Sequence, residues 1–124
     1  MDRVKDLARL AEVMGLRRAH AQSVLAKAIT SETELRRQLA QLRTDPAAEA
    51  DRPGSDADRV RRAAAEMRWQ RWADARRQTI NSELARTLAR KADARRALAR
   101  AAGKDAALEA LIHAARTKKG RRSD

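Results

Sequence analysis

The chain has 124 residues, which suffices for one small domain and is too short for two separate cores. Ala, Leu, Arg, Lys and Glu account for 77 of them, a bias typical of long helices and coiled coils, whereas Leu, Ile, Val and Phe together supply only 19. So few large apolar side chains exclude a sandwich, a barrel and an α/β enzyme core. The formal net charge of +12 favours an anionic partner such as nucleic acid, an acidic protein surface or a membrane face.

Residues 1–43 carry apolar side chains at alternating spacings of three and four, which predicts the first helix of a coiled coil. Gly15 weakens this helix by about 1 kcal/mol relative to Ala, and Ser31 with Glu34 has the spacing of a capping box. We nevertheless expect one helix through both. The apolar positions are Val4, Leu7, Ala11, Met14, Ala21, Leu25, Ala28, Leu35, Leu39 and Leu42, and the register is interrupted at Arg18 and Glu32.

Residues 44–58 are predicted to form an acidic linker between two helices. This segment holds both prolines, Pro46 and Pro53, and its net charge is −4. Proline cannot continue a helix and moves the preceding residue out of the helical region. Ser55 and Asp56 are suitable N-caps for the helix that follows.

Residues 59–117 are predicted to form a second, longer helix, and residues 118–124 a basic disordered tail. Polar residues interrupt its apolar seam at Arg77, Lys91 and Asp105. The seam candidates are Ala63, Met67, Ala73, Ile80, Leu84, Leu88, Leu98, Ala101, Leu108, Leu111 and Ile112.

Two such helices predict an all-α fold, an antiparallel two-helix coiled-coil hairpin. Pairing Leu42 with Val60 places Val4 opposite Leu98, so that the second helix outlasts the first beyond about Ala101. This overhang leaves three apolar side chains without an intramolecular partner, namely Leu108, Leu111 and Ile112.

The sequence predicts no catalytic, cofactor or metal site, and hence a protein that is not an enzyme. His20 and His113 lie far apart in the sequence without an acidic pair nearby, and the four glycines are isolated. Residues 1–10 lack the apolar stretch of a signal peptide, and no apolar run approaches the ~20 residues of a membrane span. We therefore expect a cytoplasmic protein.

The candidate partner-binding residues are aromatic and basic. Trp69 and Trp72 are three residues apart and share a helix face with arginines that stack on aromatic rings. We expect Trp72 mainly to stabilise the helix pair and Trp69 mainly to contact a partner. The complete candidate set is Trp69, Arg71, Trp72, Arg76, Arg96, Arg100, Lys104, Leu108, Leu111 and Ile112.

Residues 72–111 resemble the C-terminal helix of the FliJ/YscO-like proteins of flagellar and type III secretion export. The similarity is carried by Trp72, Arg76, Ile80-Asn81, Leu84-Ala85 and Ala102-Gly103. The resemblance implies a cytoplasmic stalk that inserts into the central hole of the export ATPase hexamer and also contacts the export gate.

Two alternatives remain open at the level of sequence. The first is a basic helical protein that binds nucleic acid, for which the affinity would fall steeply with salt. The second is a structural homodimer in which the seams pair between chains. Residues 10–16 also resemble the turn of a helix-turn-helix, but the heptad pattern continues through them.

Overall fold

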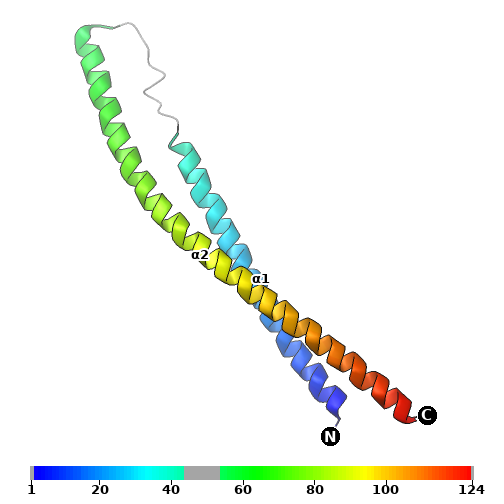
Figure 1. Cartoon of the computed structure of the whole chain (residues 1–124). Coiled ribbons are helices and arrows are strands. Elements are labelled where there is room, and N and C mark those ends of the chain that lie inside the picture. Colours follow the sequence, from blue (N-terminus) through cyan, green and yellow to red (C-terminus); the bar gives the residue numbers. More distant parts are fainter. Residues whose placement is uncertain (1, 44–53, 124) are drawn as a thin grey trace. The chain divides into compact units, whose positions relative to one another are not determined.

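The computed structural model describes residues 2–43 and 54–123, which form two long helices (Figure 1). Helix α1 spans Arg3–Gln41 and helix α2 spans Asp56–Ser123. The two helices pack against each other as an all-α helical hairpin, which confirms the predicted fold class. Most of the predicted acidic linker, residues 44–53, lies outside the described residues. None of the described helical segments combines the length and the apolar character needed to cross a membrane.

Helix α1 continues without interruption through Gly15 and Ser31. A Cβ atom at Gly15 would meet no neighbour, so the glycine serves no close approach here. All ten apolar positions predicted for this helix and its end are buried or half-buried. The heptad reading of residues 4–42 is therefore confirmed.

Ser55 caps the beginning of α2, as predicted. Its hydroxyl oxygen accepts a hydrogen bond from the Asp58 N–H at 3.3 Å, and its carbonyl accepts one from the Arg59 N–H at 3.0 Å. The hydroxyl also donates to the Asp58 carboxylate at 2.9 Å. The helix continues to Ser123, so residues 118–123 belong to α2 rather than to an irregular tail.

The chain divides into two compact units, and both helices contribute to each. The terminal unit comprises Met1–Ile29 and Ala89–Asp124, and the central unit comprises Thr30–Leu88. In the terminal unit, Arg18 bonds Asp105 at 3.2 Å while Lys119 lies 3.7 Å from Asp2. Lower numbers in α1 thus face higher numbers in α2, so the helices are antiparallel within this unit.

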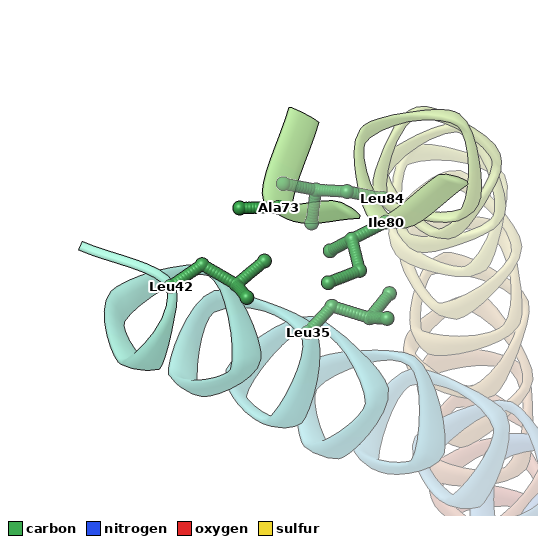
Figure 2. Packing of buried hydrophobic residues seen from close by; sticks show 5 residues of the cluster. All are labelled: Leu35, Leu42, Ala73, Ile80 and Leu84. Atoms are coloured by element: carbon green, nitrogen blue, oxygen red, sulfur yellow. The ribbon is translucent and has the colours of Figure 1, made fainter. Parts of the chain in front are cut away.

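The apolar core of the central unit is a thin layer between the helices. Figure 2 shows the side chains of Leu35 and Leu42 directed toward those of Ala73, Ile80 and Leu84. Leu39 and Trp69 pack against this layer and are partly buried. Ile80 is completely buried, and only 1% of the surface of Thr87 is exposed. Few side chains are this well covered, so each contributes a large share of the packing.

The register predicted between the helices is wrong. Arg77 donates a hydrogen bond to the Leu42 carbonyl at 2.7 Å, whereas Val60 is 68% exposed. Leu42 therefore lies beside a part of α2 roughly five turns beyond the expected one. Heptad repeats match one another at several offsets, and here polar contacts distinguish among them.

The corrected register reverses which end of α2 is covered. Residues 56–68 lie beyond the last described residues of α1 in the central unit (Figure 1). In the terminal unit Leu108 is only 5% exposed, so it does not belong to an uncovered overhang. Four residues predicted to lie in the seam are exposed, namely Ala63, Met67, Leu88 and Leu111. Two residues that were not predicted there are buried, namely Thr87 and Ala94.

Candidate functional site

A groove of about 310 Å³ opens in the central unit between the end of α1 and α2. It combines two aromatic rings, two amides and a guanidinium group above an apolar floor. We call it the tryptophan groove. Its lining residues are Gln38, Gln41, Leu42, Trp69, Trp72, Arg76 and Ile80.

The two tryptophans occupy different environments in this groove. Trp69 precedes Ala73 by one helical turn, and therefore lies on the covered side of α2 and packs against the core. Trp72 is 57% exposed. This packing is the reverse of the one expected from sequence, because Trp69 packs against the core and Trp72 is the more exposed side chain.

A chain of polar contacts positions Arg76 at the rim of the groove. Gln38 donates through its amide nitrogen to the Glu34 carboxylate at 3.2 Å, which turns its amide oxygen toward α2. That oxygen accepts a hydrogen bond from Arg76 at 3.2 Å. The carboxylate of Glu34 thus orients Gln38, and Gln38 in turn holds one nitrogen of the guanidinium group.

The charge of Glu34 is strongly stabilised. Its carboxylate accepts two hydrogen bonds from Arg37, at 2.6 and 2.9 Å. These bonds, followed by the one from Gln38, lower the pKa of Glu34 from 4.5 to about 2. The acceptor that orients the groove amide therefore remains ionised at any physiological pH.

Arg77 fastens the end of α1 to α2. It donates to the Leu42 carbonyl at 2.7 Å and to the Asp74 carboxylate at 2.8 Å. A cation at a helix C-terminus meets the partial negative charge of the last carbonyl groups. The sequence placed Arg77 correctly on the seam but did not reveal what it binds there.

The remaining candidate residues have unequal exposure. Arg71 is exposed and lines a separate shallow groove beside Met67. Leu108 is buried, Ile112 is half-buried and Leu111 is 53% exposed, so the three do not form the uncovered apolar stripe expected.

The basic candidates of the terminal unit also differ from one another. Arg96 bonds the Asp93 carboxylate one turn earlier on the same helix. Arg100 and Lys104 line a groove within that unit. The ten candidates thus belong to two different units rather than to one site.

Sequence reasoning missed Gln38 and Gln41 of the tryptophan groove. Both flank the predicted α1 seam, but a glutamine there is ordinary in any exposed helix. The register expected from sequence placed the end of α1 beside Val60 rather than beside the tryptophans, so no pattern signalled the two amides.

Within residues 2–43 and 54–123, no group of three or more His, Asp or Glu side chains is placed to hold a metal ion. Comparison with known proteins gives no relative for this chain: no protein-family model, no curated protein and no solved structure matches it.

Proposed function

We propose that this chain is a non-enzymatic, cytoplasmic stalk protein of a flagellar or type III export apparatus, which binds the export ATPase ring and the export gate. Three features support the proposal. They are the hairpin of two long helices, the excess of basic residues, and the resemblance of residues 72–111 to the FliJ/YscO-like family.

The tryptophan groove is the observation that carries the proposal. Its exposed Trp72 and nearby Arg71 are of the two residue types most enriched at the energetic centres of protein interfaces. Gln38 and Gln41 add hydrogen-bonding groups beside the aromatic ring. An apolar centre with a basic rim suits a partner that presents apolar side chains among carboxylates, because charge speeds the encounter and apolar burial holds the complex.

The register bears on where the partner docks. Docking through an apolar overhang at the C-terminal end of α2 would require Leu108 to be free, and this side chain is buried. The proposal therefore places the contact at Trp72, on the part of α2 nearest its exposed beginning.

A binding assay with the purified export ATPase tests the proposal. The full chain should bind the ring and stimulate ATP hydrolysis, and Trp72→Ala should weaken binding at least about tenfold, as for a central interface residue. Leu16→Ala is the matched control, because Leu16 is also a large exposed apolar residue but lies in the other unit. Failure of the chain to bind the ring, or equal loss in both variants, would contradict the proposal.

A titration with duplex DNA, run beside the ATPase assay, distinguishes the alternative function of nucleic-acid binding. For a nucleic-acid-binding protein, the logarithm of the association constant for duplex DNA would fall linearly with the logarithm of the salt concentration. The slope would be near −0.9 for each phosphate contacted. Tight DNA binding together with no ATPase stimulation would favour that alternative.

A further inference from the structure

The groove that Arg100 and Lys104 line has a volume of about 340 Å³ and lies in the terminal unit between α1 and α2. Its surface is mostly apolar, and basic side chains stand at its edges. The apolar lining is Met14, Ala21, Val24, Ala94, Ala97 and Ala101, and the polar lining is Arg17, His20, Arg100 and Lys104.

Small side chains explain why this part of the helix pair is hollow. Ala21 and Ala94 are buried at positions where the central unit has residues such as Leu35 and Ile80. A methyl group leaves room beside it that a leucine would fill. On the same side of α1, Val24 is 42% exposed and Leu10 is 46% exposed, so apolar surface continues beyond the groove.

The apolar surface extends along one side of the terminal unit. Residues seven apart occupy the same side of a coiled-coil helix. Members of two such rows, all except Leu10, line this groove or a groove of about 440 Å³ closer to the chain ends. The rows are Arg3, Leu10, Arg17 and Val24 on α1, and Ala97, Lys104, Leu111 and Lys118 on α2. From Arg3 to Val24 this side is about 32 Å long, or roughly six helical turns.

The charged residues that line the two grooves are basic with one exception. The single carboxylate among the lining residues, Asp2, is already occupied by Lys119. The basic lining residues of the two grooves are Arg3, Arg17, Arg100, Lys104, Lys118, Lys119 and Arg122. The side of α2 that bears Arg95 is different, since it also carries Glu109.

We infer that this side of the terminal unit binds an acidic amphipathic helix of a partner protein, which packs between α1 and α2 as a third helix. The hollow accepts apolar side chains spaced three and four apart, and the rim pairs with carboxylates on the flanks of that helix. Duplex DNA is a poorer occupant, because phosphates do not use an apolar hollow. A second copy is poorer too, because the chain carries 29 basic against 17 acidic residues. The inference uses residues apart from the tryptophan groove and does not depend on the proposed export role.

Two designed peptides test the inference with the full chain. The first is a 21-residue helix with leucines at heptad positions a and d and glutamates at e and g, and the second has lysines in place of the glutamates. Fluorescence anisotropy should show saturable binding of the glutamate peptide and none of the lysine peptide. Arg100→Glu should weaken binding at least about tenfold, because attraction becomes repulsion.

Matched variants separate the groove from general attraction to a basic protein. Arg95→Glu makes the same charge change on the other side of α2 and should alter the affinity less than about twofold. Val24→Ser should weaken binding several-fold, whereas Leu16→Ser, on the outer side of α1, should not. Circular dichroism establishes that each variant folds.

The inference would be overturned if the glutamate peptide did not bind, or if Arg95→Glu and Arg100→Glu weakened its binding equally. It would also be overturned if duplex DNA displaced the peptide and the affinity for that DNA were unchanged in Val24→Ser.

Discussion

Single residues differ in role according to what covers them, and the two tryptophans show this most clearly. Trp69 packs against the core, whereas Trp72 is mostly exposed. Trp69→Ala should therefore lower the free energy of unfolding by roughly 2 kcal/mol, less than for a fully buried tryptophan. Trp72→Ala should change it by less than about 0.5 kcal/mol. Urea denaturation measures both, and equal losses would mean that the two indoles are equally covered.

The hydrogen bonds of Glu34 predict an unusual titration. The pKa of this carboxyl group is lowered to about 2 by Arg37, with Gln38 contributing less. The stabilising contribution is therefore complete above 4.5 and is lost as the pH falls toward 2. Arg37→Gln should raise the pKa of Glu34 toward 4.5, which carboxyl NMR measures.

Arg36→Gln is the control for that titration, because Arg36 bonds Glu32 at 3.0 Å instead. A Glu34 pKa that is unaltered in Arg37→Gln, or shifted equally in both variants, would show that the carboxylate is stabilised by something other than Arg37.

At the scale of helices, the thin core makes a few buried side chains decisive. Ile80 is completely buried between α1 and α2, whereas Val60 is 68% exposed. Ile80→Ala should cost about 3 kcal/mol, since truncation leaves a gap that a narrow helix pair closes only in part. Val60→Ala should cost less than about 0.5 kcal/mol. The opposite order in chemical denaturation would support the register in which Val60 lies opposite Leu42.

How far the sequence predicts these helices depends on the spacing of their apolar residues. In α1 a three-four alternation, interrupted only at Arg18 and Glu32, identifies the covered face correctly from Val4 to Leu42. In α2 the seam passes through Thr87 and Ala94, and a threonine and an alanine cannot be recognised as buried by their side chains. Leu88 and Leu111 are predicted to be buried because they are leucines, although both are exposed.

The register between the helices could not be read from sequence, and the candidate site depended on it. Specific polar contacts distinguish it from the other offsets, such as those of Arg18 with Asp105 and of Arg77 with the Leu42 carbonyl. The donors, Arg18 and Arg77, are long side chains whose partners lie far away in sequence. Trp69 and Trp72 can be singled out by their residue type, but their unequal exposures follow from where α1 ends.

The last turns of α2 should support the first turns of α1. Asp105 bonds Arg18, Leu108 is buried, and Lys119 pairs with Asp2. In Asp2, desolvation acts to raise the pKa, but the Val4 N–H, the charge of Lys119, and the N–H and charge of Lys5 together outweigh it and lower the pKa. Removal of residues 104–124 should therefore speed amide hydrogen exchange in residues 3–20 at least about tenfold. Unchanged exchange there would mean that the C-terminal end does not pack on α1.

At the scale of the whole molecule, basic charge is shared between two surfaces that differ in shape. The central unit presents the tryptophan groove, and the terminal unit presents an apolar hollow with basic edges. A chain with separate surfaces of this kind is suited to bring two proteins together, as an export stalk that meets both a ring and a gate would have to do. Both surfaces exist only in the register that the structure shows.

Distance measurement between spin labels tests that register most directly. The chain has no cysteine, so labels attach only where one is introduced. We choose three exposed residues as labelling sites, Arg3, Ala99 and Lys118. Arg3 and Lys118 line one groove, whereas Ala99 lies about 28 Å from Lys118 along the axis of α2. Arg3→Cys with Lys118→Cys should give a distance shorter by on the order of 20 Å than Arg3→Cys with Ala99→Cys. The reverse order would restore the pairing of Val4 with Leu98 and contradict the account.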